Sequence, residues 1–371
     1  MKKICYFFII SVFLFLIGCS GGASNNDVIK IAVAGPMTGD NAEYGIGFRN
    51  AAELMAKKWN DNGGVLGKKI VIESYDDKNS GEEAVSIAQK IVSDSGYAGV
   101  IGHFISGVCM VASPIYQSSE LVNISPSASH PDFSKEGDYI FRNNTVIVVE
   151  AEAGVRLALE VLGKKKVGIL SIRTDWGTST AEITKDLVTK MGGQIVAHEE
   201  VIEGSDDYTP SISKLNNAGA DVIIVVGMYN TLAPFARQYK AINPNIAIVG
   251  FSNAYSEQLL ELGGEAVEGV VFPTTFFHAS EREDIKDFVS EYEAAYGSVP
   301  SSLTAQAYDS VGILLEAIKT AGSLDKKAIK DAVANIEYNG ITGNIKFDSI
   351  GDVQKTYTRV IIKDKQFVEI Q

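Results

Sequence analysis

The sequence is poor in the residues that bind metals or form disulfides. It holds three cysteines and four histidines in 371 residues. Cys5 and Cys19 lie in the first 19 residues, so Cys109 is the one thiol left for the folded part, and one thiol forms neither an internal disulfide nor a zinc site. We therefore expect no metal and no other cofactor. The histidines lack the spacing of metal ligands: His103, His130, His198 and His278.

An excess of positive charge is also missing. The formal net charge is -13, which leaves no basic stripe for neutralising phosphates, so we expect no nucleic-acid partner. After residue 17, no apolar run approaches the roughly 18 to 20 residues of a membrane span. The hydrophobic share of 46% and the charged share of 21% are typical of a globular chain. A chain of this length predicts about two domains.

Familiar catalytic patterns are absent as well. The sequence contains no Gly-x-Ser-x-Gly elbow, no phosphate-binding Gly-x-x-x-x-Gly-Lys and no His-Glu-x-x-His. Acidic pairs such as Asp76-Asp77 and Asp206-Asp207 are adjacent in sequence, and a solvated turn or a helix cap explains them at least as well as acid–base chemistry. We expect a protein that is not an enzyme.

The N-terminus has the pattern of an export signal. Lys2 and Lys3 precede an apolar run of about 14 residues, which is short for a membrane span. The run ends at Leu-Ile-Gly-Cys (residues 16–19), which resembles a bacterial lipobox, so we expect residues 1–19 to be a signal peptide and Cys19 to be lipidated. A plain signal peptide with a chance cysteine is the alternative. Residues 20–27 then read as a flexible tether.

From Val28 onward, short apolar runs alternate with amphipathic segments, which indicates βαβ units around parallel sheets. Predicted strands include 29–34, 70–74, 99–101 and 121–124, and after a restart of the pattern 167–172, 194–197, 222–226, 246–249 and 357–362. A helix followed by Gly-Gly and a strand occurs near residue 63 and again near residue 192. The sequence therefore predicts an α/β protein with two similar lobes.

Two predicted strands end in segments rich in hydroxyls and small residues. These segments are Gly-His-Phe-Ile-Ser-Gly at 102–107 and Ser-Pro-Ser-Ala-Ser at 125–129. Ligands of open α/β sheets bind at the carboxyl ends of strands, and hydroxyls beside a helix N-terminus suit a carboxylate. The alternative is that these serines only cap helices and form turns.

A series of short motifs in the same order along nearly the whole chain after Val28 resembles the branched-chain amino-acid-binding proteins of ATP-driven transporters. That family has the type I periplasmic binding fold, in which two lobes are joined by three crossovers. The resemblance implies lobe one at 28–146 plus 276–351 and lobe two at 147–275 plus 352–371. The motifs lie at residues 31–39, 44–45, 62–67, 75–77, 100–103, 124–129, 141–142, 207–208 and 308–309.

The resemblance also implies roles for individual residues in a cleft between the lobes. Ser106 and its loop would bind a ligand carboxylate, while the Ser127 carbonyl and the Ser129 hydroxyl would hold an ammonium group. Aromatic residues would wall the ligand side chain, although ordinary core packing is their alternative explanation. These residues are Tyr44, Phe104, Trp176 and Tyr229.

Two positions depart from the family pattern. Ser252 stands where an acidic residue of lobe two usually meets the ligand ammonium, and Ile147 replaces the usual Asp after Phe-Arg. A buried ammonium without a carboxylate partner is costly. Either Glu150 or Asp175 supplies the charge, or the ligand is an aromatic or aliphatic carboxylate, an amide or a small peptide-like compound.

The implied function is that of an exported solute-binding lipoprotein, on the outer side of the cytoplasmic membrane or in the periplasm. A hinge would close around the ligand, and the closed form would deliver it to an ABC permease with its ATPase subunits. We expect a monomer held to the membrane by its lipid anchor. The alternatives are a sensor protein that reports to a receptor or kinase, since one fold serves several uses, and a secreted enzyme.

Overall fold

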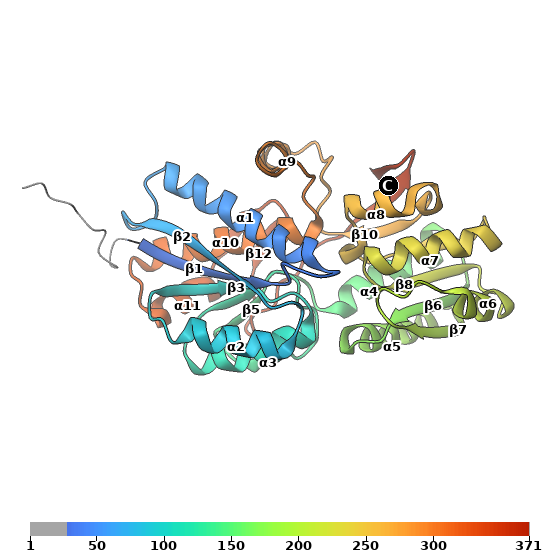
Figure 1. Ribbon diagram of the computed structural model, residues 1–371, viewed down its shortest axis with the longest axis horizontal. Helices are drawn as coiled ribbons and strands as arrows, with labels where there is room; N and C mark the ends of the chain where they lie inside the picture. Colours follow the sequence, from blue (N-terminus) through green and yellow to red (C-terminus); the bar gives the residue numbers. More distant parts are fainter. Residues whose placement is uncertain (1–27, 371) are drawn as a thin grey trace, which may run out of the picture.

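The computed structural model describes residues 28–370. The predicted signal peptide, Cys19 and the tether lie outside the described residues. Two lobes lie side by side, each with a sheet between layers of helices (Figure 1). Within residues 28–370, no helix combines the length and the apolar character that a bilayer crossing requires.

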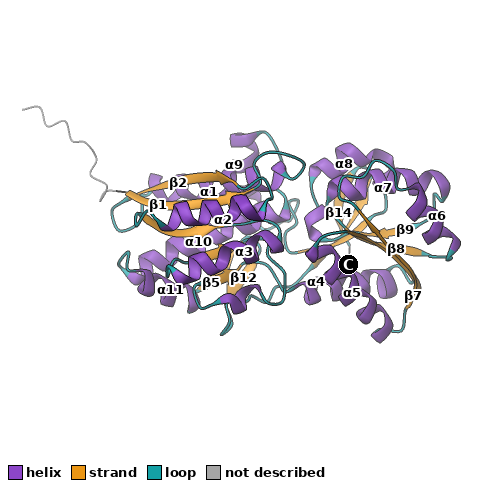
Figure 2. Ribbon diagram, turned by 60° about the horizontal axis from the view of Figure 1, so that its bottom comes forward, coloured by secondary structure: helices purple, strands orange, loops and turns teal. Residues whose placement is uncertain are grey.

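Lobe one is built on a parallel five-stranded sheet in the order β2-β1-β3-β4-β5. Helices α1 and α10 cover one face of this sheet, and α2 and α3 cover the other (Figures 1 and 2). The strands are β1 Val28–Gly35, β2 Lys69–Asp76, β3 Tyr97–Ile101, β4 Asn123–Ser125 and β5 Ile140–Arg142. The helices are α1 Ala42–Asp61, α2 Gly81–Val92, α3 Ser106–Ser118, α9 Glu283–Tyr296, α10 Ser302–Ala321 and α11 Lys326–Ala334, with a hairpin of β11 Glu337–Gly340 and β12 Gly343–Lys346.

Lobe two has a seven-stranded sheet in the order β14-β13-β10-β9-β8-β6-β7. Strand β13 pairs antiparallel with both of its neighbours, and the other pairs are parallel. The strands are β6 Lys166–Ile172, β7 Gln194–Val201, β8 Val222–Val226, β9 Ala247–Val249, β10 Val271–Thr274, β13 Thr358–Lys363 and β14 Gln366–Glu369. The helices are α4 Ile147–Arg156, α5 Asp175–Lys190, α6 Thr209–Asn217, α7 Tyr229–Ile242 and α8 Glu257–Gly263.

Local signals account for several of these elements. The apolar run of β8 is buried along its whole length, as expected for a parallel strand covered on both faces. Helix α5 begins after Thr174, whose Oγ1 accepts a hydrogen bond from the Gly177 N–H at 3.0 Å. Helix α2 begins after Ser80, whose Oγ accepts from the Glu83 N–H at 3.5 Å, but the Glu83 side chain pairs with Lys78. The Ser80 hydroxyl alone therefore caps this helix.

The chain passes between the lobes three times, between β5 and α4, after β10 and before β13. Strands β1 to β5 fall within 28–146, β6 to β10 within 147–275 and the last two within 352–371. The carboxyl ends of β3 and β4 in lobe one and of β6, β8 and β9 in lobe two lead into loops that meet between the lobes. This arrangement brings distant parts of the sequence to one cavity.

Candidate functional site

The first turn of α3 supplies one polar wall of the site. Ile105 precedes the helix and makes no capping hydrogen bond through its side chain, and Ser106 is buried. The Ser106 Oγ accepts hydrogen bonds from the N–H groups of Ser129 at 3.2 Å and His130 at 3.3 Å. A hydroxyl has two acceptor positions and one O–H donor. Both acceptor positions are used, which directs the O–H toward a further acceptor such as a carboxylate.

The loop after β4 lies against that helix start. The Ser127 hydroxyl donates to the Phe104 carbonyl at 2.7 Å, while the Ser127 carbonyl accepts from the Asn144 Nδ2 at 2.9 Å. The Ser129 Oγ accepts from the Trp176 indole N–H at 3.1 Å. Because Ser129 belongs to lobe one and Trp176 to lobe two, this last hydrogen bond joins the lobes across the site.

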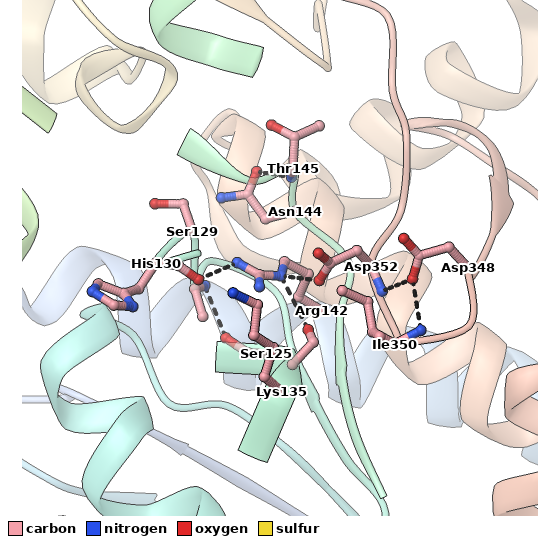
Figure 3. Close-up of polar contacts among 12 residues, drawn as sticks. Ser125, Ser129, His130, Lys135, Arg142, Asn144, Thr145, Asp348, Ile350 and Asp352 are labelled. Carbon is pink, nitrogen blue, oxygen red and sulfur yellow. Dashed lines mark hydrogen bonds and ion pairs between the residues drawn. The ribbon is translucent and has the colours of Figure 1, made fainter. Parts of the chain in front are cut away.

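A buried arginine holds in place the loop of Ser127, Ser129 and His130, called here the serine loop. Arg142 is fully buried and lies between the loop of Ser129 and His130 and the loop of Asp352 (Figure 3). Its Nε contacts the Asp352 Oδ1 at 2.5 Å, and its Nη1 donates to the His130 carbonyl at 2.7 Å. The arginine thus ties the serine loop to the segment that leads into the third crossover.

Lobe two contributes a carboxyl group from the first turns of α4. Glu150 is 4% exposed, and its Oε1 accepts a hydrogen bond from the Ser252 N–H at 2.6 Å. Burial disfavours the charged carboxylate and raises the pKa of Glu150 to about 7, despite the opposing hydrogen bonds from Ser252. Of the two acids expected to compensate for Ser252, Asp175 is exposed and only Glu150 lines the cavity. Ile147 is buried in the hydrophobic core.

These walls line a cavity between the lobes, called here the interlobe cavity, with about 30 Å³ of free volume. Small-molecule sites in proteins are mostly apolar clefts with a few placed polar groups. The apolar part comes from aromatic and aliphatic side chains of both lobes, and the polar part from hydroxyls, amides and one carboxyl. The lining residues are Phe104, Ile105, Ser106, Ser127, Ser129, Asn144, Glu150, Trp176, Met228, Ser252, Asn253 and Leu303.

Two of the predicted aromatic residues lie beside this cavity instead of lining it. The Tyr44 ring stacks on Phe104 with centroids 4.2 Å apart, and its O–H donates to the Asn253 carbonyl at 2.6 Å. The Tyr229 O–H donates to the Asp40 carbonyl at 3.2 Å, and its side chain lines a neighbouring space. Both tyrosines therefore connect the lobes. The other predicted residues lie together in the lining: Phe104, Ser106, Ser127, Ser129, Trp176 and Ser252.

Several lining residues were not among the predicted site residues. Met228 and Asn253 follow β8 and β9, so the rule of the strand carboxyl ends could have found them. Asn144 follows β5 in the same way, whereas Leu303 comes from α10, which no local sequence signal connects to the cavity. Within residues 28–370, no group of three or more His, Cys, Asp or Glu side chains is placed to hold a metal ion.

Comparison with known proteins gives one consistent result. The family model described as "Periplasmic binding protein" matches residues 28–359. The Leu/Ile/Val-binding protein homolog 1 of Brucella abortus is 29% identical over 340 residues, covering 90% of this chain and 89% of that protein. The leucine-, isoleucine-, valine-, threonine- and alanine-binding protein of Pseudomonas aeruginosa is 28% identical, with 88% of each chain covered.

The fold comparison agrees with the sequence comparison. The branched-chain amino acid transporter substrate-binding protein of Streptococcus pneumoniae, solved in complex with isoleucine, superposes with a TM-score of 0.85 at 26% identity. The match covers 92% of this chain and 100% of that one. The two-lobed architecture described above is thus shared over the full length of that structure.

Proposed function

The chain belongs to the periplasmic binding protein family, and on this basis we propose that it captures a small amino acid or related carboxylate in the interlobe cavity for an ABC importer. The observation that carries the proposal is the conjunction of Ser106, Ser127 and Ser129 with an apolar wall inside one cavity. The relatives named above bind leucine, isoleucine or valine according to their names, which supports a ligand of that size.

Capture is proposed to proceed by closure of the two lobes about the three crossovers. Trp176 of lobe two bonds to Ser129 of lobe one, and Tyr44 of lobe one bonds to the Asn253 backbone of lobe two. Such contacts form only when the lobes meet, so they favour the closed form once a ligand fills the space between them. The closed form would then dock on the permease, whose ATPase subunits supply the energy of transport.

The remaining parts of the proposal concern location and partners. We propose that the protein is exported and held at the membrane through lipidated Cys19, as a monomer that returns its ligand unchanged. A lipid anchor would keep the binding lobes near the permease without fixing their orientation. Growth and uptake with labelled ligand in cells lacking this gene would test the transport role: uptake should fall, and should return when the gene is restored.

The binding role is tested most directly at Ser106. Titration calorimetry with L-leucine should show binding by the wild type, and Ser106→Ala should bind about 10- to 100-fold more weakly because a hydrogen bond to a charged group is lost. Ser118→Ala, at the exposed end of the same helix, is the matched control and should bind as the wild type does. Equal affinity in the Ser106 and Ser118 variants would contradict the proposed carboxylate site.

A further inference from the structure

We propose that Glu150 sets the charge class of the ligand: its carboxylate binds a cationic amino group, so the cavity selects an α-amino acid over a simple carboxylate. This inference rests on the proposed function, because it names the ligand class for the same cavity. Glu150 is then a specificity-determining residue, contributed by α4 at the start of lobe two.

The wall of the interlobe cavity has an unbalanced charge. Glu150 is the one lining residue with a readily ionised side chain, and the lining contains no Lys, Arg or His. Among the described residues, no basic side chain forms an ion pair with Glu150. A buried carboxylate without a cation is unfavourable, so a ligand that carries a cation removes an energetic cost that a neutral or anionic ligand would leave in place.

The carboxyl group of Glu150 is held in place by a backbone hydrogen bond. The Ser252 N–H donates to Oε1 at 2.6 Å and holds the group at the cavity wall of lobe two. Ser127 and Ser129 line the same cavity from lobe one, and each carries oxygen atoms that can accept a hydrogen bond. An ammonium has three N–H donors and no acceptor, so one carboxylate and one oxygen from each of the two serines match its requirements. The ligand carboxylate is left for Ser106 and the start of α3.

The titratable groups near Glu150 do not supply a cation for its carboxylate. Tyr357, from the segment before β13, is the ionisable side chain that interacts with Glu150 electrostatically, and its O–H lies 2.5 Å from the Thr145 Oγ1. Asp175 is exposed and does not line the cavity. Neither group brings a positive charge, and Glu150 alone places a carboxyl group inside the cavity.

The test compares L-leucine and L-alanine with their counterparts that lack the amino group, 4-methylpentanoate and propionate. Calorimetric titrations at pH 8 should show that Glu150→Gln weakens amino-acid binding about 100-fold or more, while its affinity for the two simple carboxylates stays equal or rises. Glu152→Gln is the matched control on the same helix, because that side chain pairs with Arg156 near the surface. Its affinities should remain within twofold of the wild type.

A second variant moves the carboxylate from position 150 to a neighbouring position. It separates a role of Glu150 in ligand binding from a role in folding. Ser252 lies beside Glu150, so the double variant Glu150→Gln/Ser252→Asp returns a carboxylate to the same wall and should recover amino-acid binding at least tenfold. Two results would overturn the inference while the proposed function stands. In one, the affinity of Glu150→Gln for the amino acid stays within threefold of the wild-type affinity. In the other, the wild type binds the simple carboxylate more tightly than the amino acid. Binding of none of the four probes would instead contradict the proposed function itself.

Discussion

The polar lining of the interlobe cavity includes three serines of lobe one and one glutamate of lobe two. Ser106 and Ser127 hold their loops in place through hydrogen bonds to backbone groups within lobe one, whereas the Ser129 hydroxyl bonds to Trp176 of lobe two. This preorganisation matters because ordering side chains during binding costs affinity. A small ligand would therefore meet hydroxyls of Ser106 and Ser127 whose positions lobe one sets by itself.

Glu150 predicts a pH dependence of the stability of the ligand-free protein. Its pKa is about 7 in the folded chain against an ordinary value of 4.5, so between these values the folded state binds more protons than the unfolded state. The contribution of Glu150 to stability should grow as the pH falls through this window and be lost as the pH rises through 7. Lowering the pH from 8 to 5 should thus raise the free energy of unfolding of the wild type by roughly 3 kcal/mol relative to that of Glu150→Gln.

Urea unfolding of both proteins at the two pH values measures this difference. Other carboxyl groups with raised pKa values, such as Glu43, titrate in both proteins, so their contributions cancel in the difference between the wild type and the variant. Two results would contradict a buried carboxyl group at position 150. In one, the difference in unfolding free energy between the two proteins is the same at both pH values; in the other, the variant gains stability relative to the wild type at low pH.

At the scale of elements, the serine loop is held by the Arg142–Asp352 pair. Removing one partner of a buried ion pair leaves the other charge uncompensated, so Asp352→Asn should lower the free energy of unfolding by about 3 kcal/mol. The exposed Lys135–Asp132 pair in the same region provides the control, and Asp132→Asn should cost less than about 1 kcal/mol. Denaturant titration checks both values, and similar losses in the two variants would contradict the bracing role of Arg142.

The elements also show how much of the molecule the sequence predicts. Strands such as β8 and β6 were predicted within a residue or two because buried parallel strands form continuous apolar runs. The first turns of α4 were not predicted. Residues 146–149 are all β-branched, which lowers helix propensity, and tertiary packing decides their conformation.

The missed helix explains why the site was predicted only in part. Sequence analysis named Glu150 and Asp175 as alternatives. Without α4, nothing in the sequence decides between them, because Glu150 and Ser252 are 102 residues apart. The serines and Phe104 were found because they follow strand ends, a position that sequence patterns reveal. Leu303 enters the cavity from a helix packed on lobe one, and such a contact depends on the tertiary fold alone.

At the scale of the whole molecule, we expect the tyrosines beside the cavity to stabilise the closed arrangement of the two lobes. The Tyr44 O–H bonds to the Asn253 backbone of the other lobe, so Tyr44→Phe removes one hydrogen bond between the lobes. We expect ligand affinity to fall about fivefold, in line with a loss of roughly 1 kcal/mol. Tyr75→Phe is the control, because the Tyr75 hydroxyl contacts Glu73 and Tyr97 within lobe one.

Calorimetric titration of both variants measures these affinities, and small-angle scattering shows whether the ligand makes each protein more compact. Unchanged affinity in Tyr44→Phe, or a ligand that leaves the radius of gyration unchanged in the wild type, would contradict the closure proposed for the lobes.

A thermal-shift panel of L-amino acids, amides and simple carboxylates on the purified protein tests whether the interlobe cavity binds a small amino acid. At 100 times its dissociation constant, a ligand adds about 2.7 kcal/mol to stability, which raises the Tm by about 4 °C for a chain of this size. We expect such a shift with a small amino acid such as leucine, isoleucine, valine, threonine or alanine. A panel in which no amino acid shifts the Tm would contradict this expectation.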